Sequence, residues 1–342
     1  MKERILGRTG LSVKKLGFGG IPIQRVSEEE AILVVRYCYE QGINYFDTAR
    51  NYTVSEERIG KALEDVRGEV FLATKSSQRS KQGVLEELEV SLNNLRTDWI
   101  DVYQLHNVSS RDAWEQVKAP DGALEALYEA RDGGKIRHLG VTGHDPSLLT
   151  EIVKEDIFET VMVPFNYLTS LPAEKLLPSC REMNVGTVIM KPFGGGAFTN
   201  AKTALKFLLG DDNVDVIIPG MMSVVEAEEN VAISSGTYTL SKAELSLLEK
   251  DRVELGDQFC RACDYCQPCP QGIPISLLLR WELFEKRMGW VPRFESQFRE
   301  GVVKASTCLD CGECESRCPY HLPIRELLPV KTASLEEKLL AS

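Results

Sequence analysis

The chain has 342 residues, of which 43% are hydrophobic and 27% are charged, the composition of a globular protein rather than a disordered one. This length accommodates one barrel-sized domain of roughly 250 residues and a smaller module. The 40 basic and 51 acidic residues leave a net charge of −11, and no basic stripe stands out. Nucleic acid is therefore not expected as a partner, because neutralising its phosphates requires clustered Lys and Arg.

The N-terminal segment MKERILGRTG is charged and lacks the apolar core of a signal peptide. The longest apolar runs are too short to span a membrane. We therefore expect a cytoplasmic protein without a membrane partner. Reduced thiols in that compartment favour metal binding over disulfides.

Apolar runs alternate with amphipathic segments along the first two-thirds of the chain. After a hairpin-forming lead at 4–15, strands are predicted at 16–20, 43–48, 70–75, 101–106, 138–143, 160–166, 186–192 and 214–220. Helices are predicted at 28–41, 55–64, 83–95, 123–131, 147–155, 173–183, 201–209 and 224–234. Eight strand–helix units predict an α/β fold, a closed (β/α)8 barrel of the TIM type. An open doubly wound sheet is the competing fold, but no Gly-x-Gly-x-x-Gly turn follows any strand.

Polar side chains end three consecutive predicted strands. Asp47, Lys75 and His106 end the second, third and fourth strands, and Tyr52 lies in the loop after Asp47. Each alone has a structural interpretation, such as a helix cap or packing, but in a barrel the four would meet at one mouth. A Lys ammonium favours the phenolate and lowers the pKa of a neighbouring Tyr from about 10. This set is therefore suited to protonating a carbonyl oxygen that becomes an alcohol.

Two other pairs of residues have simpler interpretations. Glu56 and Glu57, directly after the tyrosine loop, are interpreted as first-turn charges that favour a helix N-terminus. Arg111 and Trp114, in the predicted long loop after His106, are candidates for substrate contact, with surface exposure as the alternative.

At these residues the sequence resembles an aldo-keto reductase, from about residue 3 to about residue 236. The segment FDTARNYTVSEERIGKAL (46–63) resembles the signature with the catalytic Asp and Tyr, and FLATKSS (71–77) the strand with the catalytic Lys. IDVYQLHNV (100–108) resembles the strand with the catalytic His, and GKIRHLGVTGHD (134–145) the region beside the nicotinamide carboxamide. The resemblance implies a barrel that binds NAD(P)H without a Rossmann fold and transfers hydride between it and a carbonyl or alcohol. It implies Tyr52 as proton donor, Lys75 and Asp47 as its tuning pair, and His106 as the orienting group.

The resemblance also implies cofactor contacts, and this chain departs from the family at several of them. Where the family often has Ser-Asn after strand five, a Gln in strand six and an aromatic in strand seven, this chain has Thr142-Gly143, Met162 and Met190. The run at 191–196 contains three glycines, which would let backbone amides approach a pyrophosphate. The expected cofactor-binding residues are Gly19, Gly20, Thr142, Gly143, Met162, Lys191, Pro192, Phe193, Gly194, Gly220, Glu229 and Asn230.

The segment IPGMMSVVEAEEN (218–230) resembles the family's adenosine-binding segment. Members that prefer NADPH usually place basic residues or a serine there, whereas this chain has Gly220 to Ser223 followed by Glu226, Glu228 and Glu229. Carboxylates repel a 2′-phosphate and can accept hydrogen bonds from a free ribose hydroxyl. We therefore expect NADH to be preferred over NADPH.

Eight of the ten cysteines form two tight quartets, each followed by proline. The second quartet has the C-x2-C-x2-C-x3-C-P spacing of bacterial ferredoxins, in which the fourth cysteine binds the other cluster. The first is one residue shorter before its last cysteine. Two crossed 4Fe-4S clusters are therefore expected, one on Cys260, Cys263, Cys266 and Cys318 and the other on Cys308, Cys311, Cys314 and Cys269. A four-thiolate zinc site is the alternative.

These patterns predict a barrel at 1–238, a helical linker at 239–256 and a mainly α-helical, ferredoxin-type domain at 257–342 with a helix at 275–287. Whether the clusters relay electrons or stabilise the domain stays open, because no flavin motif that would split a hydride is found. Two alternatives to the NAD(H) enzyme stay open as well: a reductase driven by the clusters, and an electron-transfer protein whose barrel has lost turnover. A redox partner protein is expected beside the small-molecule substrate, whose identity the sequence does not indicate.

Overall fold

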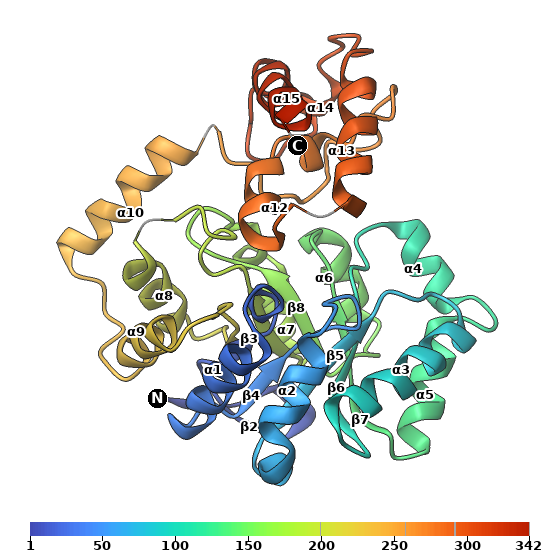
Figure 1. Cartoon of the computed structure of the whole chain (residues 1–342), viewed down its shortest axis with the longest axis vertical. Coiled ribbons are helices and arrows are strands. Elements are labelled where there is room, and N and C mark those ends of the chain that lie inside the picture. The colour runs from blue at the N-terminus through green and yellow to red at the C-terminus, as the bar shows by residue number, and fades with distance from the viewer. Residues whose placement is uncertain (199, 257, 291, 342) are drawn as a thin grey trace. The chain divides into compact units, whose positions relative to one another are not determined.

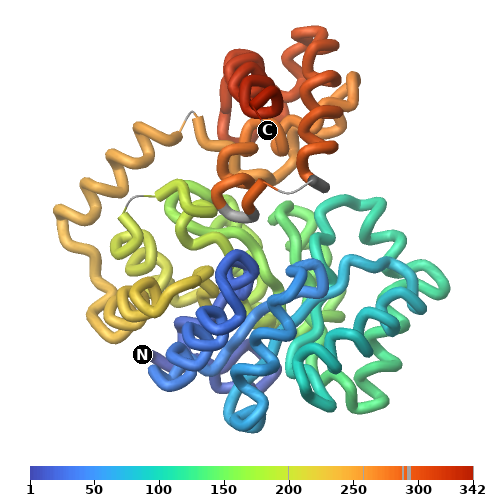
Figure 2. Tube along the Cα trace, in the orientation of Figure 1, coloured from blue at the N-terminus to red at the C-terminus, as the bar shows by residue number. Residues whose placement is uncertain are grey.

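The computed structural model describes residues 1–198, 200–256, 258–290 and 292–341 (Figure 1). The chain forms two compact units, traced from blue to red in Figure 2. The barrel unit comprises Met1–Phe193 and Asn200–Ser241, and the cysteine unit comprises Gly194–Thr199 and Lys242–Ser342. The predicted domain limits at 238 and 256 stay predictions. None of the described helices combines the length and the hydropathy needed to cross a membrane.

The barrel unit is built on an eight-stranded parallel sheet in which each strand pairs with the next along the chain. Its strands are β3 Phe18–Gly19, β4 Tyr45–Asp47, β5 Phe71–Ser76, β6 Ile100–Leu105, β7 Ile136–Thr142, β8 Thr160–Pro164, β9 Gly186–Met190 and β10 Val216–Ile217. Parallel bridges from Leu16 to Ile217 and from Gly19 to Gly220 join the two edges. The barrel fold and its eight predicted strands are therefore confirmed, with ends that differ by at most three residues.

Helices lie outside these strands, as Figure 1 shows. They are α1 Glu28–Glu40, α2 Ser55–Leu63, α3 Lys81–Leu95, α4 Arg111–Lys118, α5 Ala123–Asp132, α6 Pro146–Lys154, α7 Leu176–Glu182, α8 Ala201–Leu209 and α9 Val224–Ser234. Short 3-10 helices are η1 Gly7–Thr9, η2 Pro22–Arg25, η3 Glu64–Glu69 and η4 Leu171–Ala173. Capping residues define where two of these helices begin: Ser27 and Glu30 form a capping box on α1, and Ser80 caps α3. One prediction is wrong, because α4 occupies the expected loop after His106. The helix expected at 173–183 is present as α7, three residues shorter at its start and one at its end.

The barrel has an interior core and an outer core between strands and helices. Along β6, Val102 belongs to the interior cluster, while Tyr103 and Leu105 belong to the outer one, as the period of two in a strand requires. Gly140 of β7 gives space to the interior, since a Cβ there would lie 2.5 Å from Thr160 Oγ1 and 2.8 Å from Gln104 Cγ. Gln104 and Thr160 can therefore occupy the interior of the barrel only because residue 140 has no side chain.

The N-terminal hairpin closes the end of the barrel at which the strands begin. It consists of β1 Glu3–Ile5 and β2 Ser12–Lys14, paired antiparallel. Leu6 and Val13 of this hairpin are fully buried in the interior cluster. Thr9 Oγ1 accepts from Leu11 N at 3.1 Å, which stabilises the turn between the strands. The predicted hairpin is confirmed.

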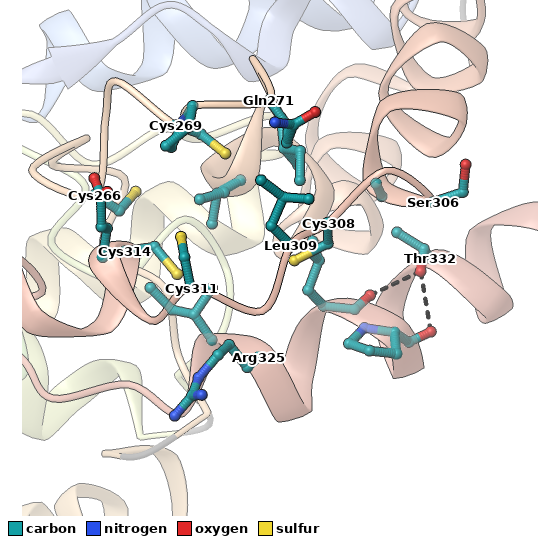
Figure 3. Close-up of a pocket in the computed structure, with 18 of the residues that line it drawn as sticks. Cys266, Cys269, Gln271, Ser306, Cys308, Leu309, Cys311, Cys314, Arg325 and Thr332 are labelled. Carbon is teal, nitrogen blue, oxygen red and sulfur yellow. Dashed lines mark hydrogen bonds between the residues drawn. The ribbon is translucent and has the colours of Figure 1, made fainter.

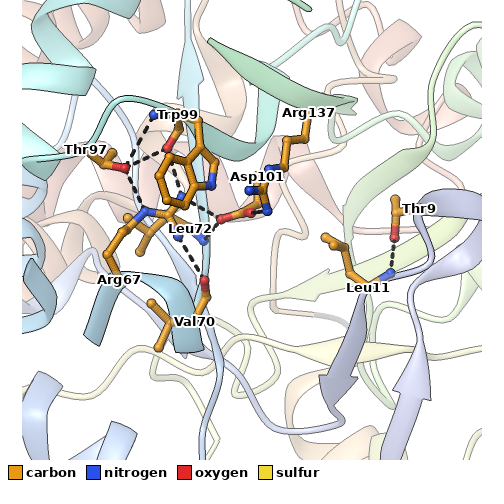
Figure 4. Close-up of polar contacts among 9 residues, drawn as sticks. All are labelled: Thr9, Leu11, Arg67, Val70, Leu72, Thr97, Trp99, Asp101 and Arg137. Carbon is orange, nitrogen blue, oxygen red and sulfur yellow. Dashed lines mark hydrogen bonds and ion pairs between the residues drawn. The ribbon is translucent and has the colours of Figure 1, made fainter. Parts of the chain in front are cut away.

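A buried polar network stabilises the same end of the barrel (Figure 4). Arg67 donates to Thr97 Oγ1 at 2.8 Å and to the carbonyls of Val70 and Trp99 at 2.9 and 2.8 Å. Its Nη2 also lies 2.7 Å from Asp101 Oδ2, which accepts a further hydrogen bond from a backbone amide. The Arg67 guanidinium lies 4.5 Å from the centre of the Trp99 ring, a cation–π contact.

The cysteine unit is mainly helical and has its own core. Its helices are α10 Lys242–Leu255, α11 Ile275–Leu278, α12 Trp281–Met288, α13 Pro292–Ala305, α14 Glu313–Ser316 and α15 Ile324–Ala341. Buried Leu278, Phe298 and Leu335 bring α11, α13 and α15 together. The single helix expected at 275–287 is wrong. The chain leaves the helix at Arg280, whose φ of −125° is not helical, and starts α12 one residue later.

Candidate active site and cluster ligands

A buried ion pair lies at the C-terminal ends of β4 and β5. Lys75 Nζ lies 2.5 Å from Asp47 Oδ1 and 2.7 Å from Thr48 O, and both charged residues are at most 2% exposed. Gln104 Nε2 donates to Asp47 Oδ2 at 2.9 Å. Burial raises the pKa of Asp47, while the Lys75 ammonium and the Gln104 amide oppose that rise. The lysine ammonium is therefore held in one direction by two acceptors.

Tyr52 and His106 lie beside this pair. The Lys75 ammonium is 5.1 Å from the centre of the Tyr52 ring. The Tyr52 and His106 rings meet edge to face, with their centres 5.8 Å apart. The structure thus brings together all four residues that the sequence singled out, although they come from three strands and one loop. Their individual roles stay proposals.

His106 is a neutral imidazole in this setting. Burial, with the Lys75 and Arg79 cations, lowers the pKa of His106 to about 3. Arg79 Nη2 donates to the backbone carbonyl of His106 at 2.7 Å, and His106 Nδ1 lies 3.4 Å from Ser77 Oγ. A neutral imidazole can donate one hydrogen bond and accept another, but it does not add a positive charge to the mouth.

A second polar chain lies at the same mouth. Lys191, directly after β9, places its Nζ 2.6 Å from His144 Nε2. His144 Nδ1 lies 3.0 Å from Asn107 Oδ1, which also accepts from Ser109 Oγ at 2.7 Å. These partners are consistent with an Nδ1-protonated, neutral His144 that accepts from the lysine ammonium. The chain brings a lysine to the C-terminal end of β9 and holds it there.

Sequence reasoning missed Gln104 and the burial of Glu56. Gln104 is fully buried, and its signal was an inward-facing polar residue two positions before His106 on the same strand. Glu56 is also fully buried: it accepts from Thr74 Oγ1 and Ser91 Oγ at 2.7 Å and pairs with Arg50. Glu56 therefore ties the tyrosine loop to β5 and α3, in addition to lying in the first turn of α2, as its interpretation as a first-turn charge requires. Its neighbour Glu57 is exposed, as that interpretation requires.

Arg111 and Trp114, the candidates for substrate contact, lie in α4. Trp114 is 4% exposed, and its Nε1 donates to Glu155 Oε1 at 2.8 Å. Arg111 pairs with Glu151 at 2.7 Å. Both contacts join α4 to α6 or the residue after it, so packing accounts for Trp114 and an exposed ion pair for Arg111.

The expected cofactor residues lie on three parts of the barrel unit. Gly19 and Gly220 are bridged, and Thr142 Oγ1 accepts from Asn107 N at 2.9 Å. Met162 is 1% exposed and belongs to the interior cluster, which accounts for it by packing. Asn230 is 5% exposed on α9. The cofactor contacts of these residues, and those of Gly20, Gly143, Lys191, Pro192, Phe193 and Glu229, stay predictions.

Gly194 belongs to the cysteine unit. Gly194, Gly195 and Gly196 have φ values of 59°, 76° and 95°, which L side chains rarely adopt. A Cβ at Gly194 would lie 2.6 Å from the Phe198 ring. Backbone conformation and packing therefore account for these glycines, and the contact of Gly194 with a pyrophosphate stays a prediction.

The eight quartet cysteines line two spaces in the cysteine unit. One is a cavity of about 270 Å³ lined by Cys266, Cys269, Cys308, Cys311 and Cys314, whose sulfur atoms surround it in Figure 3. A smaller space is lined by Cys260, Cys263, Cys266 and Cys318. Cys269 thus joins the second quartet and Cys318 the first, which supports the crossed ligand assignment. No three described His, Cys, Asp or Glu residues are grouped for a single metal ion.

The donor chemistry of both spaces fits iron–sulfur clusters. Each space offers at least four thiols, and thiolate is the usual ligand of iron in such clusters. Burial, with Cys260 and Cys318 nearby, raises the pKa of the Cys263 thiol to about 12. Iron would have to displace this proton and supply the compensating positive charge. Cys38 and Cys180 are buried in the barrel unit, and burial raises the pKa of both thiols to about 12, as expected of inert cysteines.

A parallel barrel that gathers Asp, Lys, Tyr and His at the C-terminal ends of its strands is the architecture of one family of oxidoreductases. The chain belongs to the aldo/keto reductase family, whose sequence model matches residues 15–204, and it carries a 4Fe-4S dicluster domain, whose model matches residues 259–323. The fold class and the presence of an iron–sulfur domain are thereby confirmed, and the zinc alternative is not supported.

Similar proteins cover most of the barrel. The chain is 27% identical over 301 residues to an L-galactose dehydrogenase of Arabidopsis thaliana, which spans 73% of the chain and 93% of the relative. An uncharacterized oxidoreductase of Bacillus subtilis is 30% identical over 213 residues, covering 58% and 67%. Among solved structures, the holo form of an aldo-keto reductase from Bacillus halodurans has a TM-score of 0.64 at 28% identity and covers 73% of this chain and 96% of its own. An aldo/keto reductase from Klebsiella pneumoniae, in complex with NADP and acetate, shares the fold at 22% identity with a TM-score of 0.63, covering 74% and 95%.

Proposed function

We propose that the barrel transfers a hydride between NAD(H) and a carbonyl or alcohol substrate, with Tyr52 exchanging the proton at the substrate oxygen. The observation that carries the proposal is the Lys75 ammonium, which Asp47 holds 5.1 Å from the centre of the Tyr52 ring. A cation beside a phenol favours the phenolate and so lowers the cost of giving up the proton. A bound nicotinamide would supply or accept the hydride.

The residues around Tyr52 have separate roles in this proposal. Asp47 and the Thr48 carbonyl aim the Lys75 ammonium, and Gln104 fixes the second oxygen of Asp47. His106, which is neutral, orients the substrate oxygen by a hydrogen bond. Because Lys75 and Asp47 are at most 2% exposed, water does not screen their interaction.

The nicotinamide cofactor would be held by the expected residues of the barrel unit. The donor set fits its chemistry: the mouth offers the Thr142 hydroxyl and the Lys191 ammonium, and α9 offers the Asn230 amide. Ammonium and amide donors are suited to phosphate and adenine groups. The departures at Thr142-Gly143, Met162 and Met190 remove side chains that are typical of the family, so backbone amides would carry more of the binding.

We propose NADH as the preferred cofactor because of Glu226. Its carboxylate accepts from Met222 N at 2.8 Å, which puts a negative charge beside the segment that resembles the adenosine site. Burial raises the pKa of the Tyr37 phenol on α1, and Glu228 adds to that rise, so Glu228 lies near α1. Arg25 Nη2 lies 3.2 Å from Met222 Sδ and is the cation that a 2′-phosphate would meet there.

Dissociation constants of NADH and NADPH test this preference. We expect tighter NADH binding in the wild type. Glu226→Gln, which keeps an acceptor for Met222 N, should narrow the difference between the dissociation constants of NADH and NADPH. Arg25→Ala should widen that difference. Tighter NADPH binding by the wild-type protein would contradict the preference for NADH and would leave the proposal of hydride transfer unaffected.

A second candidate function is electron exchange with a redox partner protein. Cys308 and Cys311 are exposed, so a cluster on the second quartet would lie near the surface. Bleaching of cluster absorbance by NADH alone would favour a relay that includes the barrel. Bleaching only by an external one-electron donor would favour exchange through the cysteine unit.

Anaerobic purification, with iron and sulfide counts, followed by a substrate screen under NADH tests the proposed function. The screen should contain aldehydes, ketones and, in the reverse direction with NAD, alcohols and sugars, including L-galactose. We expect turnover of at least one of these classes. Turnover that persists after Tyr52→Phe with clusters intact would overturn the role of Tyr52.

A further inference from the structure

A buried guanidinium lies in the cysteine unit between two of its helices. Arg280 follows Leu279, the C-cap of α11, and precedes Trp281, the first residue of α12. It is 5% exposed, and within the described part of the chain its Nε has no hydrogen-bond partner. A buried charge without compensation is strongly unfavourable, so folding retains it only where a negative group faces it.

Arg280 is adjacent to the space that the first quartet lines, because Leu279, the residue directly before it, lines that space together with Cys260, Cys263, Cys266 and Cys318. Asp264, which also lines this space, is an exposed carboxylate that accepts from Ser276 Oγ at 2.5 Å. The geometry therefore places a buried guanidinium next to the wall of the first quartet's space, whereas the carboxylate on that wall is exposed to water.

Arg261 adds a second buried cation on the same side. It is 8% exposed, and it donates to the carbonyls of Gly256 and Phe259 at 2.8 and 2.6 Å. Its guanidinium lies 4.4 Å from the centre of the Tyr320 ring. These contacts hold Arg261 beside the first quartet, where Cys260, Cys263 and Cys318 all act on it electrostatically.

The second quartet has the opposite surroundings. Cys308 and Cys311 are exposed. The nearby Arg325, which also lines the cavity of Figure 3, is exposed and pairs with Glu315 at 2.9 Å and with Asp310 at 3.5 Å. Carboxylates therefore neutralise the charge of Arg325, and water screens it.

We propose that Arg280 is a charge-compensating residue that selectively raises the reduction potential of the cluster held by Cys260, Cys263, Cys266 and Cys318. One-electron reduction adds one negative charge to a cluster that four thiolates already make negative. Burial alone disfavours that added charge, and a buried guanidinium offsets the penalty because little solvent screens it. The electron comes from an external one-electron donor, no bond breaks, and no proton needs to move. The two clusters therefore differ in reduction potential.

An anaerobic redox titration of the full chain, followed by electron paramagnetic resonance with dithionite as reductant, tests this proposal. A soluble paramagnetic chelate, which broadens the signal of the more exposed cluster, assigns the two signals. We expect Arg280→Met to lower the potential of the buried cluster and to leave that of the exposed cluster unchanged. Arg280→Lys should keep most of the wild-type potential. The matched control, Arg325→Met, should leave the buried cluster unchanged.

An unchanged potential of the buried cluster in Arg280→Met, or equal shifts in the Lys and Met variants, would overturn the proposal. Loss of a cluster is also decisive, and iron and sulfide counts detect it. If Arg280→Met and Arg280→Gln each lose one cluster while Arg280→Lys keeps both, the site requires the charge and the proposal stands. If the Lys variant loses the cluster too, Arg280 acts by shape, and the proposal fails. None of these readouts depends on carbonyl reduction, so they are independent of the proposed barrel function.

Discussion

The barrel holds two buried ion pairs, one at each end, and they are built differently. At the N-terminal end, Arg67 makes four hydrogen bonds, and Asp101 accepts from Arg67, from Leu72 N and from Arg137 (Figure 4). At the C-terminal end, Lys75 donates to Asp47 and to Thr48 O. There the described side chains leave Gln104 Oε1 without a partner.

The difference separates stability from chemistry. In the Arg67 network, fixed donors and acceptors surround both charges. No donor or acceptor of the pair therefore remains for a ligand. The Lys75 pair keeps its charge next to Tyr52 and His106, which belong to the open mouth of the barrel. This matches the general division of such barrels, in which the C-terminal face reacts and the N-terminal face stabilises.

The largest effect is expected at Tyr52. Tyr52→Phe removes the proton donor and keeps the ring that packs against His106. We expect kcat/KM for carbonyl reduction to fall by about 10²–10⁴-fold. The thermal unfolding temperature and the iron content should stay at wild-type values. Full activity in the Phe variant would show that another group supplies the proton.

Arg67→Met should lower stability and leave catalysis unchanged, the opposite of the effects expected for Tyr52→Phe. It leaves the Asp101 carboxylate buried without its main partner, and we expect the free energy of unfolding to fall by about 3–5 kcal/mol. The kcat of the folded enzyme should not change. Arg137→Met is the matched control: its side chain is 50% exposed on the same carboxylate, so it should cost about 0–1 kcal/mol. Urea denaturation measures both, and equal losses in the two variants would contradict the proposed difference between buried and exposed partners.

A smaller effect is expected at Gln104, which links the ion pair to the interior. Gln104→Leu removes the donor to Asp47 Oδ2, at a cost of about 1–3 kcal/mol. Because that hydrogen bond opposes the rise in the pKa of Asp47, its loss should raise this pKa further. The acid limb of the kcat profile should then move to higher pH. An acid limb that stays at the wild-type pH would show that the protonation of Asp47 does not control kcat.

The smallest effect concerns His106. Its folded-state pKa is about 3, whereas an unfolded His titrates near about 6.5, so the unfolded chain binds the proton first as pH falls. The stability contribution therefore declines between about pH 6.5 and about pH 3, and stability rises with pH across that window. His106→Gln should flatten this dependence, measured by the urea midpoint at several pH values. Identical slopes in both proteins would contradict the depressed pKa.

The sequence was informative where a residue's role follows from its position on a strand. Asp47, Lys75 and His106 end neighbouring strands, so the barrel prediction was sufficient to bring them together. Gln104 was missed because an inward polar residue is recognised only when the strand register and the space left by Gly140 are known. The tertiary network of Glu56 gives no local signal, because an acidic residue in a first turn has the same pattern when it is exposed.

The cysteine unit shows the same limit. Cysteine spacing was sufficient to predict two clusters and to suggest the exchange of Cys269 and Cys318. The break at Arg280 was not predictable from the apolar periodicity of 275–287, because the backbone there is set by where the guanidinium is buried. Propensity favoured one continuous helix, and tertiary contacts produced two.

Deuterium transfer is the most direct test of hydride chemistry at the barrel mouth. NADH carrying deuterium at C4 is mixed anaerobically with the cluster-loaded protein and a carbonyl substrate identified by the screen, and the alcohol is analysed by mass spectrometry. We predict that deuterium moves from the cofactor to the carbinol carbon in wild-type protein, and that Tyr52→Phe slows this transfer. An alcohol that carries only solvent hydrogen at that carbon would contradict direct hydride transfer and would point to the clusters as the source of electrons.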